Sequence, residues 1–471
     1  MKIKHFDLGI EENDPFRECK LNRKPYAEIL TNIVESYSDS FVLAIDNEWG
    51  TGKTTFLKMW SQELKNRGFR TLYFNAWEND FENDVLVALI SELQDLKDKG
   101  SERIFNQLVK QAAPLTKRLL QGLVKTQIEK YAGNEFAEDT IQLSRDDFTK
   151  YLKGQIKGYN DRKKAIQSFK YSLEKFVNQS NEGKPLIFII DELDRCRPNY
   201  SVEVLEQIKQ LFAVNGIVFV LSIDKIQLCH AIRGVYGNEN IDAEEYLRRF
   251  IDIEYSIPDP NTEVFCKYLY DYFQFDEFFT FDQRLKYQIF RGDKETFLHF
   301  STILFDYEKL PLRSQEKIFS HARLTLTLFG NSQFVLPNLL ILLIFLRARY
   351  RPLYNKIKTG SLSLQELIDE IEKILPQNIH EDVIRQFIHT EALLLLTYNN
   401  ALKSKTKHQI LAQDPDTQEK RLSILSRLDK SPQNEVFITM VEAISQFGGS
   451  RLDIDIHHLI SKIDLISPIS E

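Results

Sequence analysis

The chain has 471 residues, of which 43% are hydrophobic and 27% are charged, and these proportions exclude a protein that is disordered throughout. At about 100–200 residues per domain, the length allows two to four domains. The net charge of −7 excludes a chain that is basic throughout, and the scarcity of glycine (18) and proline (14) favours long helices over an all-β fold.

The cysteines and the apolar segments indicate a cytoplasmic protein. The four cysteines are far apart and form no C-x-x-C pair, so we expect free thiols in a reducing compartment. The N-terminus has no apolar signal segment. The most apolar run, 334–346, contains Pro337 and is shorter than the roughly 18–20 residues of a spanning helix. We therefore expect a buried core helix there, and a membrane segment is not expected.

Apolar runs alternate with helical patterns over the first 260 residues. Buried strands are predicted at 41–45, 70–75, 185–190 and 217–223, and alternation over 250–257 indicates an edge strand. Strands that alternate with helices are typical of βαβ units. This part of the chain is therefore predicted to be an α/β domain with a parallel sheet.

A phosphate-binding loop follows the first predicted strand. Gly52, Lys53 and Thr54 fill the last three places of the pattern G-x-x-x-x-G-K-[ST], and Asn47 stands at the first glycine place. Asn tolerates left-handed backbone, so we expect the turn to form. Backbone N–H groups would converge on the β- and γ-phosphates, with Lys53 as a mobile charge and Thr54 as a Mg²⁺ ligand. The predicted nucleotide contacts of the loop are Asn47, Glu48, Trp49, Gly50, Thr51, Gly52, Lys53, Thr54 and Thr55.

Two acids follow the third predicted strand directly. Buried, unpaired charge is costly, so Asp191 and Glu192 indicate a cationic ligand at this strand end. We expect Asp191 to hold Mg²⁺ through water, and Glu192 to orient and deprotonate the attacking water. Both motifs would lie at the carboxyl ends of parallel strands, where such sheets bind ligands. The alternative is that the acids only pair with Arg195 and Arg197.

Polar residues also follow the fourth predicted strand. Ser222 and Asp224 stand where P-loop ATPases with an extra strand between the two motif strands sense the γ-phosphate. The alternative for such residues is a helix cap. The N/T-K-x-D pattern of GTP-binding proteins does not fit this strand end, so ATP is the predicted nucleotide, with Mg²⁺.

These motifs together resemble the KAP family of P-loop NTPases. The resemblance spans about residues 20–330, and its most specific element is the D-x-x-D-R-C-x-P block at 191–198. It implies an additional-strand ATPase core of the STAND and AAA+ kind. Many members carry transmembrane helices between the two motifs, whereas this chain is polar there, which implies a soluble bacterial member. Several soluble relatives belong to anti-phage defence gene clusters.

The resemblance also implies contacts beyond the two motifs. Arg195 would pair with Asp194 or reach a phosphate in a neighbouring subunit. Of Arg248 and Arg249, only one can face a nucleotide, and Arg249 is the predicted nucleotide contact. An arginine finger in trans from this pair would couple hydrolysis to assembly. The alternative for this pair is a salt bridge to a nearby glutamate.

Three further residues carry expectations from the same resemblance. Arg313 resembles the lid arginine that contacts the γ-phosphate, and Arg23 precedes the first helix, where related ATPases contact adenine. Asn75 would lie at the end of the second strand.

The predicted organisation has four parts. Residues 1–96 and 184–260 form the P-loop NTPase core, which a helical insertion at 97–183 interrupts. A helical lid-like region at 261–330 precedes a C-terminal domain at 331–471 that is predicted to be all-helical.

The insertion carries a local positive charge. Residues 103–130 hold six Lys and Arg against one Glu, and further basic residues extend the tract to 164. Three interpretations remain open: a solvated helix packed on the core, a nucleic-acid contact, and a membrane-surface or partner helix.

The sequence therefore predicts Mg-dependent ATP hydrolysis that drives an oligomerising molecular switch or motor, acting in anti-phage defence. A homo-oligomer and an effector or partner protein are expected. The alternatives are a nucleotide-gated interaction module and a nucleic-acid-engaging scaffold with little turnover.

Overall fold

The computed structural model describes residues 9–37, 40–82, 84–97, 100–116, 145–179, 183–237, 240–375, 381–402, 409–413, 420–431, 434–448 and 454–465. The chain divides into two compact units, 7–259 and 260–471. The sheet and the insertion belong to the first unit, and the predicted lid-like and C-terminal regions belong to the second. Each unit is described by itself.

The first unit is built on a five-stranded parallel sheet in the order β2-β3-β4-β1-β5. The strands are β1 (Phe41–Asp46), β2 (Thr71–Asn75), β3 (Leu186–Asp191), β4 (Ile217–Ile223) and β5 (Ile253–Tyr255). β4 lies between β1 and β3, which confirms the expected extra strand between the two motif strands. β5 pairs only with β1 and forms one edge of the sheet, as its alternating pattern predicts.

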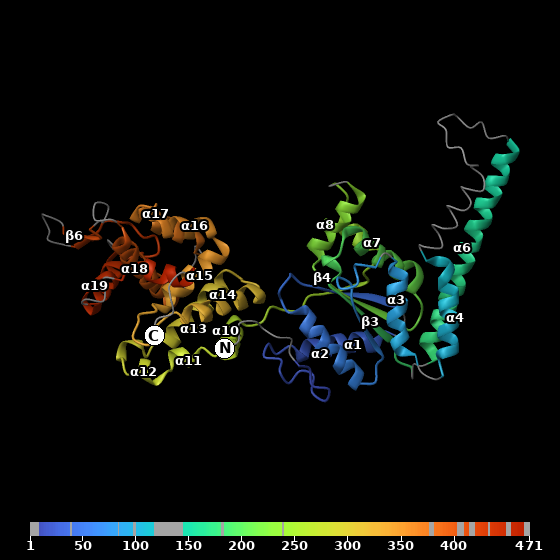
Figure 1. Ribbon diagram of the computed structural model, residues 1–471, viewed down its shortest axis with the longest axis horizontal. Helices are drawn as coiled ribbons and strands as arrows, with labels where there is room; N and C mark the ends of the chain where they lie inside the picture. Colours follow the sequence, from blue (N-terminus) through green and yellow to red (C-terminus); the bar gives the residue numbers. More distant parts are fainter. Residues whose placement is uncertain are drawn as a thin grey trace. The chain divides into compact units, whose positions relative to one another are not determined.

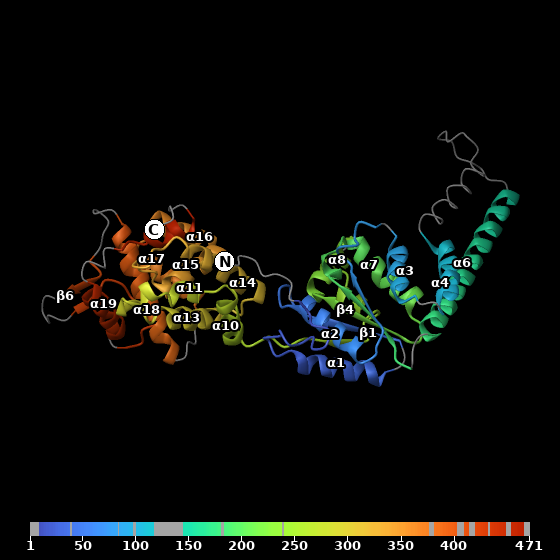
Figure 2. The ribbon, with the colours of Figure 1, turned by 60° about the horizontal axis from the view of Figure 1, so that its bottom comes forward.

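Helices cover both faces of this sheet (Figures 1 and 2). One face packs against α1 (Lys24–Ser36) and α2 (Lys53–Asn66), through a cluster that includes Ile187 and Ile189. The other face carries Phe188 and Ile190 and packs against the remaining helices. Successive side chains of a strand point to opposite faces, so a strand covered on both faces is apolar throughout. The helices on this second face are α3 (Val85–Leu93), α7 (Pro198–Gln207) and α8 (Lys225–Tyr236).

The insertion is helical, as expected. Its described elements are η1 (Gln94–Leu96), α4 (Glu102–Ala112), η2 (Ala113–Leu115) and α6 (Arg145–Gln179). α4 and α6 pack side by side, with the rings of Phe105 and Phe176 at 5.6 Å, and Phe169 joins the core of the sheet. Figure 1 shows α6 extending well beyond α4. The segment 117–144 of the basic tract lies outside the described residues.

The second unit is almost entirely helical. Residues 337–346 of α15 are all buried, which confirms the predicted core helix. In the described part of the chain, no helix is both long and apolar enough to cross a membrane. The predicted all-helical region needs one correction, because β6 (Leu411–Gln413) and β7 (Lys420–Leu422) pair antiparallel. The helices are α10 (Thr262–Tyr272), α11 (Asp276–Phe279), α12 (Asp282–Leu285), η5 (Gln288–Phe290), α13 (Asp293–Tyr307), α14 (Leu312–Leu326), α15 (Pro337–Arg349), α16 (Arg351–Thr359), α17 (Leu364–Ile374), α18 (Glu381–Ala401), α19 (Glu435–Gly448) and α20 (His457–Ile463).

Candidate nucleotide-binding site

The loop between β1 and α2 has the backbone that its glycines permit. Gly50 and Gly52 have φ of +84° and +83°, the left-handed region that L side chains rarely adopt. Asn47 does not have a positive φ, so the expectation that it replaces glycine through left-handed backbone is wrong. Its side chain instead forms two hydrogen bonds with the backbone of Ile257, two residues after the edge strand β5. Nδ2 donates to the carbonyl of Ile257 at 2.8 Å, and Oδ1 accepts from the amide of Ile257 at 2.9 Å.

Lys53 begins α2 and folds back over the loop. Its ammonium donates to the carbonyl oxygen of Asn47, and to that of Glu48 at 3.1 Å. Burial lowers the pKa of Lys53, and nearby carboxylates oppose this effect, in the order Asp194, Asp224, Asp191 and Asp46. The loop cation therefore lies in the field of acids from the ends of β1 and β3 and from the residue that follows β4. Phosphate oxygens could replace the two carbonyls as acceptors. Thr54 and Thr55 lie half-buried in the first turn of α2.

Asp191 ends β3 as a buried carboxylate with neutral partners. Its Oδ2 accepts from the hydroxyl of Tyr73 at 2.7 Å, and its Oδ1 accepts from the amide of Glu192 at 2.9 Å. Burial and Asp191 raise the pKa of Tyr73, which keeps its hydroxyl a donor. Both partners are uncharged donors, so a cation could bind this carboxylate without displacing an ion pair. This donor chemistry, with the Thr54 hydroxyl, fits Mg²⁺. The role of Tyr73 could not be predicted from the sequence, because it depends on the pairing of β2 with β3.

Glu192 has a left-handed backbone, with φ of +60°, between β3 and η3 (Leu193–Arg195). Oε2 accepts from the side-chain amide of Asn75 at 3.2 Å, and Oε1 contacts Nη1 of Arg195 at 2.5 Å. Burial raises the pKa of Glu192, and Arg195 and Asn75 act against it. Arg195 thus pairs with Glu192, as the ion-pair alternative for the two acids expected, and not with Asp194. Arg197 pairs with Asp80 at 2.8 Å rather than with either motif acid.

Trp49 connects the phosphate loop to the turn after β3. Its indole Nε1 donates to Oδ2 of the buried Asp194. Burial raises the pKa of Asp194, whereas the bond from Trp49 and the charge of Lys53 act in the opposite direction. This contact links the two motifs directly. It was not predicted, since nothing in the spacing of the two segments indicates it.

Ser222 and Asp224 lie at the same edge of the sheet. Ser222 is fully buried, and its Oγ has no hydrogen-bond partner among the described residues. Asp224 caps α8, accepting from the amide of Gln227 at 3.2 Å, which is the helix-cap alternative for this residue. Its charge also raises the pKa of Lys53. The end of β4 therefore carries a helix cap at Asp224 and a buried hydroxyl at Ser222 that has no partner among the described residues.

Arg249 lies at the opposite, amino-terminal ends of the strands. It follows α9 (Ala243–Leu247) and precedes β5, and with Ser40 and Val42 it lines a cavity of about 190 Å³. These two residues lie at the amino end of β1, whereas the phosphate loop follows its carboxyl end. The six residues of β1, at about 3.3 Å each, separate the amino end of this strand from its carboxyl end by about 20 Å. Arg249 therefore does not face the nucleotide site of its own chain.

The other candidate arginines have separate surroundings. Arg248 pairs with Glu245 at 2.9 Å, the salt-bridge alternative, and both side chains are exposed. The guanidinium of Arg249 lies over the ring of Tyr246 at 5.9 Å. Arg313 is exposed in the first turn of α14, in the second unit.

Arg23 contacts the loop rather than solvent. It is buried, and it donates to the carbonyl oxygens of Thr51 at 2.7 Å and Gly52 at 3.2 Å. Both acceptors belong to the loop itself. This contact to the loop backbone was not predicted, because one arginine before a helix forms no pattern.

Comparisons with known proteins give one curated relative and several solved structures. The phage T7 exclusion protein of Escherichia coli (strain K12) is 22% identical over 258 residues, which is 49% of this chain but only 33% of that protein. The ORC2 protein of Aeropyrum pernix, solved in ADPNP–ADP complexes, is 15% identical over 90% of this chain and 94% of its own, with a TM-score of 0.32. Cdc6p of Pyrobaculum aerophilum is 12% identical over 92% of this chain and 96% of its own, with a TM-score of 0.30.

A family model gives the most extensive assignment. The model described as the KAP family P-loop domain matches residues 23–296, more than half of the chain. The match includes the phosphate loop, the acids after β3 and the whole parallel sheet. The chain therefore belongs to the KAP family of P-loop NTPases.

Proposed function

We propose that this chain is a Mg-dependent ATPase that acts as an oligomerising molecular switch. One observation carries the proposal: the ammonium of Lys53 lies in the field of Asp191, Asp194 and Asp224, at a single edge of the sheet. A site with a loop for phosphates and nearby acids for a metal suits a nucleotide bound together with Mg²⁺.

Each residue has a distinct role in this proposal. Lys53 binds the β- and γ-phosphates, and the N–H groups of the loop cradle the same oxygens. Asp191 and Thr54 hold Mg²⁺, which neutralises charge on the phosphates when bound. Glu192 exchanges its bonds to Asn75 and Arg195 for the attacking water and accepts the proton of that water at its carboxylate.

Turnover and binding measured on three proteins test the proposal. Wild type should hydrolyse ATP only with Mg²⁺, Glu192→Gln should bind Mg-ATP but turn over at least about a hundredfold more slowly, and Lys53→Ala should lose binding. GTP serves as the control nucleotide. Equal and negligible turnover by wild type and Glu192→Gln, with intact binding in both, would reject the enzyme.

A nucleotide-gated module with little turnover is the second candidate. It is favoured by the state of Glu192, since both carboxylate oxygens are already engaged by Asn75 and Arg195. In this case ATP binding alone would change the partner interaction. An effector or partner protein would then bind the ATP-loaded form and release it when ATP is removed, without a requirement for hydrolysis.

An arginine finger in trans would couple hydrolysis to assembly. Arg249 lies at the sheet edge away from its own phosphate loop, so it would act on the nucleotide of another copy. Arg195, Ser222 and Arg313 complete the proposed set of phosphate contacts. We propose a homo-oligomer on this ground.

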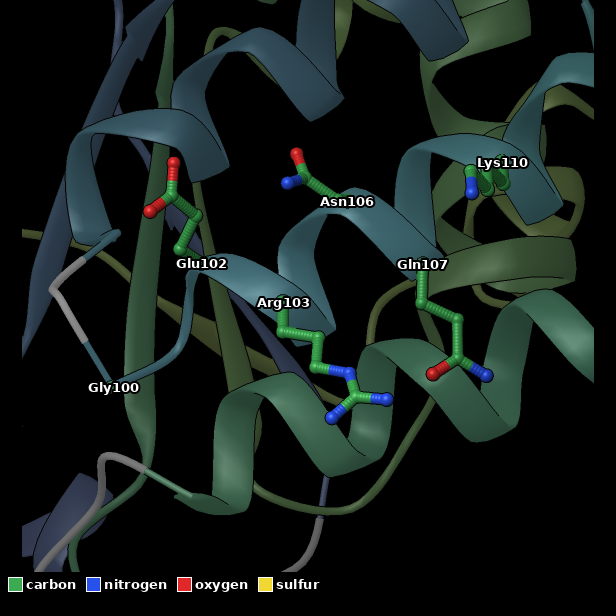
Figure 3. A pocket seen from close by; sticks show the side chains of 6 residues that line it. All are labelled: Gly100, Glu102, Arg103, Asn106, Gln107 and Lys110. Carbon is green, nitrogen blue, oxygen red and sulfur yellow. The ribbon is translucent and has the colours of Figure 1, made fainter.

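Nucleic acid is a further candidate partner of the insertion. A hollow of about 650 Å³ lies on α4. In Figure 3, the side chains of Arg103 and Gln107 extend to one side of this helix and those of Glu102 and Asn106 to another. Lys110 also lines the hollow, and Lys153 and Lys157 are exposed on α6. Binding of duplex or single strands that weakens with salt, and weakens again in Lys153→Glu/Lys157→Glu, would support this role.

A place in anti-phage defence belongs to the same proposal. It is supported by the weak similarity to the phage T7 exclusion protein. A cytoplasmic location is supported by the four cysteines, all of which are free thiols. Phage plating on cells with wild type and with Lys53→Ala tests the role in defence.

A further inference from the structure

Arg23 is a buried cation beside the phosphate loop. Its side chain is 4% exposed, and burial lowers its pKa. Its Nε is buried without a hydrogen-bond partner, and Asp259 acts on its pKa only through its charge, so no described carboxylate pairs with Arg23. A guanidinium buried without a counter-ion is costly. Packing alone therefore does not explain why an arginine stands at this position, and the contacts of its two terminal nitrogens become important.

Those nitrogens hold two successive peptide groups of the loop. Nη2 donates to the carbonyl of Thr51 and Nη1 to that of Gly52. The peptide bonds are trans, so the C=O and N–H of one peptide group point in opposite directions. Holding these two oxygens toward Arg23 turns the amides of Gly52 and Lys53 away from it. The carbonyl of Gly52 also accepts from the amide of Phe56 at 3.1 Å, so the first turn of α2 is tied to the same contact.

We propose that Arg23 is a positioning residue for the polyphosphate. It fixes the direction of the Gly52 and Lys53 amides before a nucleotide binds, and this inference rests on the nucleotide site proposed above. Preorganised amides bind an anion without paying for reorientation at the moment of binding. A polyphosphate also brings negative charge to a loop that Arg23 makes positive. Since both terminal nitrogens already hold the loop, the role concerns the phosphates rather than the adenine.

A ligand without a base distinguishes a role of Arg23 in phosphate binding from a contact between Arg23 and the adenine. Inorganic tripolyphosphate with Mg²⁺ has the phosphates of ATP and no base or sugar. Arg23→Met keeps an unbranched side chain and removes the charge and the donors. It should weaken Mg-tripolyphosphate and Mg-ATP by the same factor, on the order of tenfold or more for two misdirected amides. A loss for Mg-ATP alone would overturn the inference in favour of a base contact.

A second pair of measurements separates positioning from a structural role. In nucleotide-free Arg23→Met, amide hydrogen exchange of a peptide spanning 47–56 should accelerate. The Tm should stay at or above that of wild type, since a buried unpaired charge is removed. A purely structural role predicts that Tm and phosphate affinity fall together. If Arg23→Met does not fold, Arg23→Lys decides: its single ammonium cannot hold both carbonyls, so it should keep the Tm and lose part of the tripolyphosphate affinity.

The outcomes distinguish this inference from the proposed function. If wild type and Lys53→Ala bind Mg-ATP equally weakly, the nucleotide site is wrong, and hydrogen exchange of the free protein still tests the hold of Arg23 on the loop. If wild type binds, Lys53→Ala does not, and Arg23→Met binds tripolyphosphate like wild type, the site stands and the inference is overturned.

Discussion

The side-chain amide of Asn75 donates a hydrogen bond of 3.2 Å to Oε2 of Glu192, the carboxylate that directly follows Asp191. The two residues come from neighbouring strands, since Asn75 pairs in register with Asp191. Burial raises the pKa of Glu192, and the hydrogen bond from Asn75 opposes this effect because it stabilises the ionised carboxylate. The end of β2 therefore tunes the proposed base.

Removing this amide should move the pH dependence of turnover. In Asn75→Ala the pKa of Glu192 rises, so the carboxylate ionises at higher pH and the acidic limb of the kcat profile shifts upward. A shift of about half to one pH unit is expected from one hydrogen bond. Asn79→Ala is the matched control, because its side chain bonds only the carbonyl of Asn75. An unchanged or lowered limb in Asn75→Ala would contradict the role of the amide.

Trp49 should report the arrival of nucleotide. Its indole is 44% exposed and donates to Asp194 in the crevice proposed for the phosphates. Phosphate binding to Lys53 changes the field around this pair, so we expect tryptophan fluorescence to change with Mg-ADP. The change should vanish in Trp49→Phe and persist in a control variant of the fully buried Trp60, Trp60→Phe. A change that survives Trp49→Phe would place the signal elsewhere.

Complementation should reveal a finger acting in trans. Arg249→Ala has an intact phosphate loop, and Lys53→Ala has an intact Arg249. Each alone should be inactive, and mixed oligomers should recover turnover, because one copy supplies the loop and the other the arginine. Arg248→Ala is the control, since Arg248 is occupied by Glu245. Turnover by Arg249→Ala alone would remove Arg249 from the site.

Glu391 of α18 should limit stability at neutral pH. It is 1% exposed, and one of its carboxylate oxygens has no partner among the described residues. Burial, with the charge of Glu372, raises its pKa well above the usual value. The folded state thus keeps it protonated where the unfolded chain ionises, and stability falls as pH rises from the unfolded to the folded pKa.

Glu391→Gln should therefore unfold at higher urea concentration than wild type at pH 7.5, and the difference should shrink toward pH 4.5. The gain grows by at most about 1.4 kcal/mol per pH unit, and only between the unfolded and the folded pKa of Glu391. Glu370→Gln is the control, because Glu370 is only half-buried, pairs with Lys373 at 2.7 Å and has a lowered pKa. A gain that is the same at both pH values would mean that Glu391 is ionised in the fold.

Asn47→Gly should restore the usual glycine of the loop and still destabilise the protein. The change removes both hydrogen bonds to Ile257 and leaves its two backbone groups without these partners. Two such bonds contribute about 1–3 kcal/mol. Urea unfolding measures the loss of stability. Asn47→Ala is the control, because it also removes the two hydrogen bonds but does not add the backbone freedom of glycine. Stability above wild type in Asn47→Gly would show that the bridge contributes nothing.

The sheet and the two motifs were predictable because strands buried on both faces are apolar without interruption. The runs at 186–190 and 217–223 end at the positions where β3 and β4 meet the crevice. Parallel pairing then brings Asp191 and the loop to one edge, whatever their separation along the chain.

The contacts that tune the site were not predictable, because each joins segments that only the register brings together. Asn47 meets Ile257 across 210 positions, and Tyr73 meets Asp191 across 118. Arg195 pairs with Glu192 rather than with Asp194 because of the local backbone: Glu192, the residue before η3, adopts a left-handed conformation. The pairing of β6 with β7 was missed because three-residue strands are too short to show a period.

The double hydrogen bond between Asn47 and Ile257 has a mechanical consequence. Ile257 lies two residues before the end of the first unit at Asp259, so the bridge anchors the start of the connecting segment directly to the phosphate loop. No helix or strand stands between the loop and residue 257, so a movement of the loop backbone at Asn47 would strain these two bonds first. The residue that departs from the usual phosphate-loop pattern is thus the one that ties the loop to the last residues of the first unit.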